Sequence, residues 1–84
     1  MRNLSHVICA IINQIPEDFE HRESLVRRLS YVKDSFAYTA PEALYLRWDQ
    51  CSEILGEYIP KPTTDWQMTV ANIFSADVNY EDYL

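Results

Sequence analysis

Apolar residues recur at helical spacing in four segments of the chain. Within each segment they fall mostly three and four residues apart. This spacing matches the 3.6 residues of an α-helical turn, so each segment carries one apolar face. Most breaks between segments lie beside proline, which lacks the amide hydrogen that a helix interior needs. The pattern predicts four helices over about residues 4–15, 17–37, 41–58 and 65–75.

The first segment is rich in isoleucine and valine, and β-branched residues also favour strands. The helical interpretation is preferred because the apolar spacing is helical and no partner strand is predicted. Its apolar face comprises Leu4, Val7, Ile8, Ile11, Ile12 and Ile15.

Local signals predict where the later helices begin. Pro16 is followed by two acidic residues, which the positive end of a helix dipole favours. Thr39 and Thr64 each open a capping-box pattern, completed three residues later by Glu42 and Gln67. We therefore expect helices to begin near Pro16, just after Thr39 and just after Thr64.

Packing of these apolar faces predicts a compact all-α bundle of three to four helices. The 84 residues are enough for one helical domain spanning 1–84, ending in a short acidic tail. A single glycine argues against an all-β fold, whose turns require more. The predicted shared core is Leu25, Leu29, Val32, Phe36, Leu44, Trp48, Cys51, Leu55, Val70 and Ile73.

Compartment and metal chemistry follow from what the composition lacks. No apolar run approaches the ~18 residues of a membrane span, and no signal peptide precedes the first charges. We therefore expect a cytoplasmic protein in which Cys9 and Cys51 are free, buried thiols. His6 and His21 could complete a zinc set with them, but structural zinc sites usually bring two close ligand pairs, and only His6 and Cys9 are close. We expect no metal and no cofactor.

No catalytic arrangement stands out in the chain. Glu17 and His21 lie one helical turn apart, a spacing more typical of a solvated side-chain pair than of acid–base catalysis. No glycine-rich phosphate loop or nucleophile motif accompanies them. We therefore expect a protein without enzymatic activity.

Charge is distributed unevenly. The net charge is −6, and all of it comes from residues 36–84, because the charges of residues 1–35 cancel. The predicted second helix carries basic residues that could hold phosphates, but acidic residues alternate with them. Mixed signs favour a solvated helix with internal ion pairs. These basic residues are Arg22, Arg27, Arg28 and Lys33.

Tyrosine is abundant, with six residues in 84. The predicted core is already filled by other residues, so several tyrosines should lie at the surface among acidic side chains. Tyrosine is enriched in protein interfaces because it offers a large contact area at little entropic cost. The predicted partner-binding residues are Glu42, Tyr45, Asp49, Glu53, Asp77, Tyr80, Glu81, Asp82 and Tyr83.

These features favour a small, acidic, non-catalytic protein-binding module whose partner has a basic surface. An inhibitor or modulator of a nucleic-acid-handling complex fits, as in phage or mobile-element anti-defence proteins, because carboxylates can imitate phosphates in a basic groove. Two alternatives remain: a nucleic-acid-binding regulator that uses the basic residues of the second helix, and a small structural subunit of a homo-oligomer.

Overall fold

The computed structural model describes residues 4–76 of the chain, and no strand occurs among them. The prediction of an all-α fold is confirmed. The α-helices are α1 (Leu4–Gln14), α2 (Arg22–Ser35), α3 (Leu44–Tyr58) and α4 (Asp65–Ala76), and two short 3-10 helices, η1 (Phe36–Tyr38) and η2 (Pro41–Ala43), connect α2 to α3.

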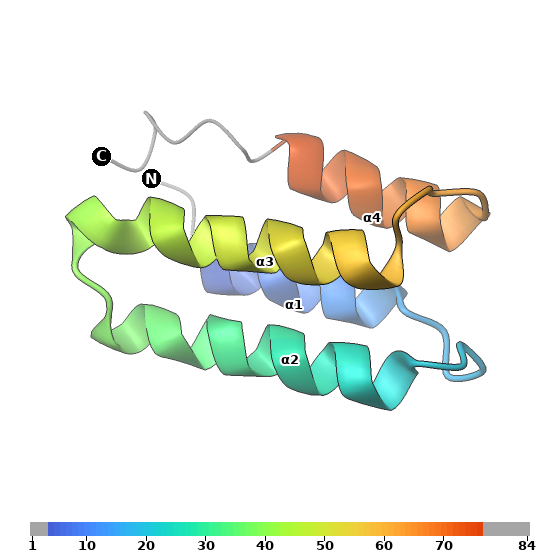
Figure 1. Cartoon of the computed structure of the whole chain (residues 1–84), viewed down its shortest axis with the longest axis horizontal. Helices are drawn as coiled ribbons and strands as arrows, with labels where there is room; N and C mark the ends of the chain where they lie inside the picture. The colour runs from blue at the N-terminus through green and yellow to red at the C-terminus, as the bar shows by residue number, and fades with distance from the viewer. Residues whose placement is uncertain (1–3, 77–84) are drawn as a thin grey trace.

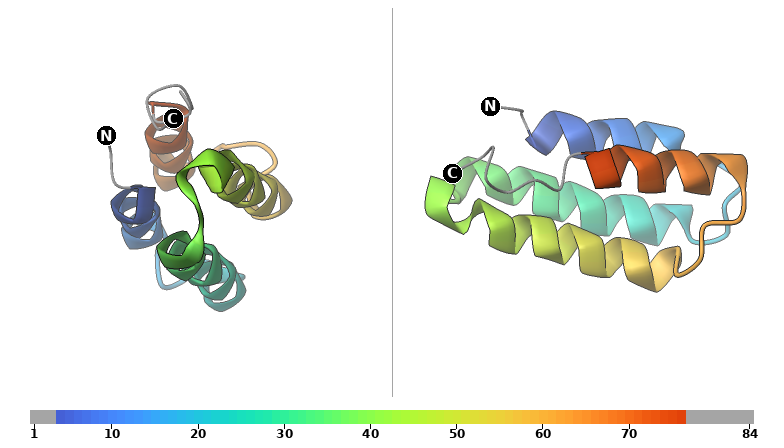
Figure 2. Two further views of the ribbon diagram at one scale, coloured as in Figure 1. Left: turned by 90° about the vertical axis from the view of Figure 1, so that its left-hand side faces the viewer. Right: turned by 90° about the horizontal axis from the view of Figure 1, so that it is seen from above.

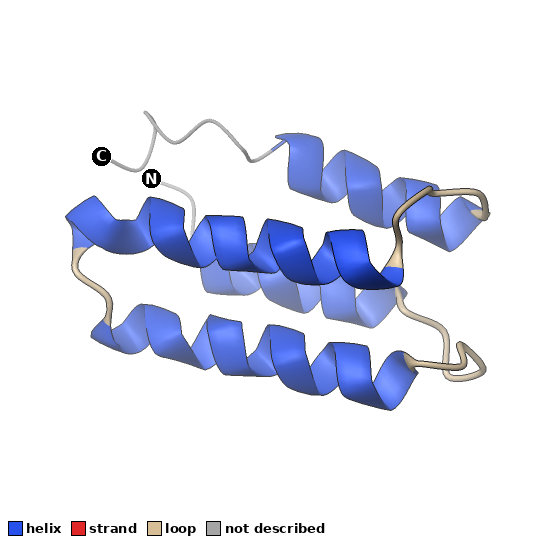
Figure 3. Ribbon diagram, in the orientation of Figure 1, coloured by secondary structure: helices blue, strands red, loops and turns tan. Residues whose placement is uncertain are grey.

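Consecutive helices run antiparallel, so the bundle alternates up and down (Figure 1). Viewed from the end, the four helices occupy the corners of a square, with α1 between α2 and α4 and diagonally opposite α3 (Figure 2). Only helices and their connections are drawn for the described chain (Figure 3). The backbones pack most closely between α1 and α4, between α2 and α3, and between α1 and α2.

The core lies where the four apolar faces meet. Trp48 is its largest fully buried side chain, and its indole ring stacks on the Phe74 ring at 4.6 Å between centroids. Most of the predicted core is buried, while Phe36, Leu44 and Ile73 are partly buried at its edge. The buried residues are Leu4, Val7, Ile8, Ile11, Ile15, Leu25, Leu29, Val32, Trp48, Cys51, Ile54, Leu55, Ile59 and Val70.

The start of α2 differs from the sequence-based expectation. The helix begins at Arg22, and the residues after Pro16 form turns in which the Phe19 amide donates to the Pro16 carbonyl at 3.2 Å. These turns allow Phe19 to pack edge-on against Trp66 of α4, with centroids 4.9 Å apart. Burial of this aromatic pair outweighs the local preference for acidic residues in a first helical turn.

The two capping-box patterns have different outcomes. At α4 the backbone N–H of Gln67 donates to Thr64 Oγ1 at 3.4 Å. In return, the backbone N–H of Thr64 donates to Gln67 Oε1 at 3.3 Å, so this capping box is confirmed. The box at Thr39 is wrong, because Thr39 Oγ1 donates to the Ser35 carbonyl and accepts from Arg47. Its hydroxyl completes the end of the preceding helix, and α3 begins at Leu44 without a side-chain cap.

Gly56 lies inside α3, where a Cβ atom would meet nothing within 4 Å. Glycine in a helix costs about 0.5–1 kcal/mol relative to alanine because it loses more conformational freedom on folding. We therefore expect Gly56→Ala to raise the free energy of unfolding by about that amount. Urea denaturation checks this, and a loss of stability would show that α3 and α4 need the open space at Gly56.

Candidate protein-binding face

An exposed line of acidic and apolar side chains runs along η2 and α3, and we call it the acidic face. Four of its members were predicted from the sequence, and all four are exposed. Within α3 the spacing of Tyr45, Asp49 and Glu53 follows the helical repeat, so these three share one side of the helix, and Glu42 precedes them in η2. The acidic face comprises Glu42, Tyr45, Leu46, Asp49 and Glu53.

Leu46 is the member of the acidic face that the sequence analysis missed. Its side chain is 48% exposed, and that of Tyr45, the preceding residue, is 43% exposed. The helical spacing from Glu42 to Leu46 and on to Glu53 is the signal that could have identified it. Two exposed apolar side chains therefore lie between carboxylates along the chain, an arrangement typical of an anchor with a charged rim.

The remaining predicted partner-binding residues lie outside the described part of the chain. They are Asp77, Tyr80, Glu81, Asp82 and Tyr83.

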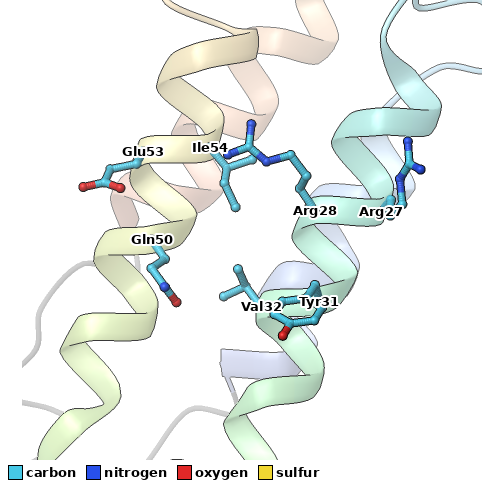
Figure 4. Close-up of a pocket in the computed structure, with 7 residues that line it drawn as sticks. All are labelled: Arg27, Arg28, Tyr31, Val32, Gln50, Glu53 and Ile54. Atoms are coloured by element: carbon cyan, nitrogen blue, oxygen red, sulfur yellow. The ribbon is translucent and has the colours of Figure 1, made fainter.

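A pocket of about 380 Å³ lies between α2 and α3. Figure 4 shows Arg28 and Val32 extending from α2 toward α3, where Ile54 lies across from them, while Glu53 is turned away from α2. Glu53 therefore links the acidic face to the rim of this pocket. The lining residues are Arg27, Arg28, Tyr31, Val32, Gln50, Glu53 and Ile54.

Polar contacts hold α2 and α3 together next to this pocket. Arg28 forms an ion pair with Glu57 and lies over the Tyr58 ring, with the guanidinium carbon 5.6 Å from the ring centroid. The hydrogen bond from Arg28 lowers the pKa of the Glu57 carboxyl. The hydrogen bond between the hydroxyls of Ser24 and Tyr58, which lie 2.5 Å apart, and the hydrogen bond with Arg28 lower the pKa of the Tyr58 hydroxyl. These contacts are long-range in sequence, so no local motif predicts them.

The basic residues of α2 do not form one stripe. At 100° per residue, positions 22, 27, 28 and 33 are spread around the helix. Arg22 Nε donates to the Ile15 carbonyl at 3.2 Å, and Arg28 pairs with Glu57. Two of the four cations therefore serve the fold itself, which weakens the alternative of a phosphate-binding helix.

Tyr31 and Tyr38 are the most exposed large hydrophobic side chains among the described residues, at 80% and 92%. The binding face predicted from the sequence lies on later segments and does not include these two residues. They lie seven residues apart, which is about two helical turns, and outside the face formed by Leu25, Leu29 and Val32. This spacing could have identified both tyrosines as exposed.

The thiols and histidines do not assemble into a metal centre. Within residues 4–76 no group of three or more His, Cys, Asp and Glu side chains could hold a metal ion. Cys51 is fully buried, and burial raises the pKa of its thiol to about 12. Cys9 is only half-buried, contrary to expectation, because it lies on the flank of α1 beside the buried face; both cysteines are free.

The lengths and polarity of the helices also bear on membranes. Among the described segments, no helix combines the length and the apolar character needed to cross a lipid bilayer.

Comparisons of the chain with protein-family models, with curated proteins and with solved structures found no match.

Proposed function

We propose that this chain is a non-catalytic protein-binding module that uses the acidic face to bind a partner with a basic surface. The observation that carries the proposal is the exposure of Tyr45 and Leu46 between three exposed carboxylates. Neither Tyr45 nor Leu46 is among the residues that form the core. Exposed aromatic and aliphatic anchors with a charged rim are typical of protein interfaces.

The partner class follows from charge. A basic surface that normally binds nucleic acid attracts carboxylates, and we propose that the protein modulates or inhibits a nucleic-acid-handling complex in this way. The carboxylates of Glu42, Asp49 and Glu53 span about 16 Å along the helix axis. A nucleic-acid strand would place more charges over that length, at about 3.4 Å each. The acidic face therefore depends on Tyr45 and Leu46 for much of its affinity.

Charge reversal on the acidic face tests this proposal. We expect Asp49→Lys combined with Glu53→Lys to weaken partner binding at least tenfold, because attraction is replaced by repulsion of a basic surface. Both side chains are exposed on α3, so the melting temperature should change little. Binding is measured with immobilised protein and the partner purified from the native host, at 50 and 300 mM salt, with duplex DNA and RNA as competitors.

The matched control is Glu17→Lys combined with Asp18→Lys, in the loop between α1 and α2. Both double variants change the net charge from −6 to −2, so a non-specific effect of charge would weaken binding equally. We expect the loop variant to bind like the wild type, and the wild type to lose affinity at higher salt because exposed charges are screened over roughly 8–10 Å. Equal losses of partner affinity in the two double variants would contradict the proposal. Binding to the partner that duplex DNA and RNA do not compete away would contradict it as well.

A further inference from the structure

The side of the bundle between α3 and α4 is more open than the other three sides. The backbones pack closely between α1 and α2, between α2 and α3 and between α1 and α4, but less closely between α3 and α4, which are also adjacent in the end-on view (Figure 2). A groove of about 140 Å³ lies between these two helices, and we call it the α3–α4 groove. Its lining residues are Ser52, Leu55, Gly56, Ile59, Pro62, Gln67, Val70, Ala71, Phe74 and Ser75.

The α3–α4 groove is suited to an apolar group. None of its lining residues is charged, and three of them, Leu55, Ile59 and Val70, belong to the buried core. Gly56 lines the groove without a side chain, and a Cβ atom there would meet nothing within 4 Å. The volume is below the ~300 Å³ of typical ligand pockets but close to the ~150 Å³ of an apolar cavity that binds benzene. The groove therefore accommodates one side chain of about the size of leucine or phenylalanine.

The groove continues the acidic face along α3. Residues that follow one another four, three, four and three positions apart form one line along a helix. The line that begins at Tyr45 and Asp49 of the acidic face continues in this way through Ser52, Gly56 and Ile59, which line the groove. A partner that contacts the acidic face therefore reaches the groove without crossing another element of the bundle.

The charges beside the groove on α3 are acidic. Asp49 and Glu53 are exposed, and each lies three residues before a lining residue of the same helix. Glu57, the third carboxylate of α3, is paired with Arg28 of α2. Lys61 is the one cation that adjoins a lining residue in the sequence, and it follows the end of α3. The α3 edge of the groove therefore attracts basic side chains.

We propose that the partner of the acidic face inserts one leucine- or phenylalanine-sized side chain into the α3–α4 groove, from a segment in which lysine or arginine residues adjoin that side chain. The apolar group leaves water for the groove, and its basic neighbours lie along the α3 edge near Asp49 and Glu53. Interfaces usually concentrate their affinity in such a buried anchor. This inference rests on the proposed function, because it names the part of the partner that contacts the acidic face.

Two blocked pentapeptides test the groove. The first has one leucine between two pairs of lysines, and the second has serine in place of the leucine, so the charge of the two peptides is the same. Each is titrated into the isotopically labelled full chain and followed by NMR. We expect the leucine peptide to shift the amide signals of Gly56, Ala71 and Phe74. It should bind about tenfold more tightly than the serine peptide, because burial of a leucine side chain contributes at least that factor.

A substitution that fills the groove tests where the leucine binds. Ala71→Leu leaves the net charge unchanged, and it should weaken binding of the leucine peptide about tenfold, to the affinity of the serine peptide. The matched control, Ala10→Leu, makes the same substitution at an exposed position of α1 and should bind both peptides like the wild type. Gly56→Ala adds one methyl group to the groove and should also weaken binding of the leucine peptide. Since this variant is expected to be more stable than the wild type, its loss of affinity cannot come from unfolding.

The outcomes separate this inference from the proposed function. Unshifted groove amides, equal affinities for the two peptides, or equal effects of Ala71→Leu and Ala10→Leu would overturn the groove and leave the charge-reversal test of the acidic face unaffected. Shifts of the same amides when the protein alone is concentrated would show that a second copy fills the groove, and would overturn it too. Partner binding that survives reversal of Asp49 and Glu53 would contradict the proposed function, whatever the peptides show.

Discussion

Trp48→Ala should lower the free energy of unfolding by about 3–5 kcal/mol, as expected when a buried aromatic residue is truncated. The Trp48 side chain is 1% exposed, and its ring stacks on Phe74. The substitution removes a stacked aromatic contact between α3 and α4. Small domains are stable by about 5–15 kcal/mol, so the variant should be marginally folded. Urea denaturation monitored by circular dichroism measures the change.

A second substitution at the same position separates packing from hydrogen bonding. The indole N–H of Trp48 is buried and has no hydrogen-bond acceptor among the described residues. Trp48→Phe keeps an aromatic ring against Phe74 and removes this unsatisfied donor. It should therefore lower the free energy of unfolding much less than Trp48→Ala does. Tyr31→Ala removes an aromatic side chain that is 80% exposed and should change stability by no more than ~0.5 kcal/mol. Similar costs for Trp48→Ala and Tyr31→Ala would contradict the core assignment.

Stability should fall steeply above pH 9 because of Cys51. Burial raises the pKa of its thiol from 9.0 to about 12, so the thiolate is favoured only in the unfolded chain. The stabilisation of the folded state that comes from the protonated Cys51 thiol is therefore fully present below pH 9 and is lost as the pH rises toward 12. At 1.36 kcal/mol for each unit of pKa, the loss is about 2 kcal/mol by pH 10.5 and about 4 kcal/mol by pH 12.

Comparison with a variant separates the contribution of the Cys51 thiol from every other effect of pH on stability. Urea denaturation at pH 8, 9, 10 and 10.5 should show a smaller loss for Cys51→Ala than for the wild type, by about 2 kcal/mol at pH 10.5. The matched control, Cys9→Ala, removes the half-buried thiol of α1. Its free energy of unfolding should fall with rising pH as much as that of the wild type. Parallel curves for the wild type and Cys51→Ala would show that the folded chain accommodates the Cys51 thiolate.

Part of the candidate site could be predicted from the sequence. The exposure of Glu42, Tyr45, Asp49 and Glu53 follows from helical spacing alone, because all four belong to one short segment. The α2–α3 pocket and the Arg28–Glu57 pair could not be predicted, since their residues lie on separate helices. The side chains of Asp77 and of residues 80–83 lie outside the described chain, so their place in the acidic face stays a prediction.

The sequence by itself determined the helices and which side of each is buried. Leu25, Leu29 and Trp48 are buried because apolar spacing is a local property that a helix turns directly into one face. The cap of α4 was predictable for the same reason, since Thr64 and Gln67 are three residues apart. The cap of α3 was not, because Thr39 had competing partners in Ser35 and Arg47.

Only the tertiary structure decided which helices are neighbours. Packing of Phe19 on Trp66 replaced the expected first turns of the second helix, because burial of two aromatic rings outweighs a local end preference. The two walls of the α3–α4 groove come from separate helices and become one surface only when the chain closes into a square bundle. Local spacing carries no information about such pairing, which depends on how all four apolar faces can be covered at once.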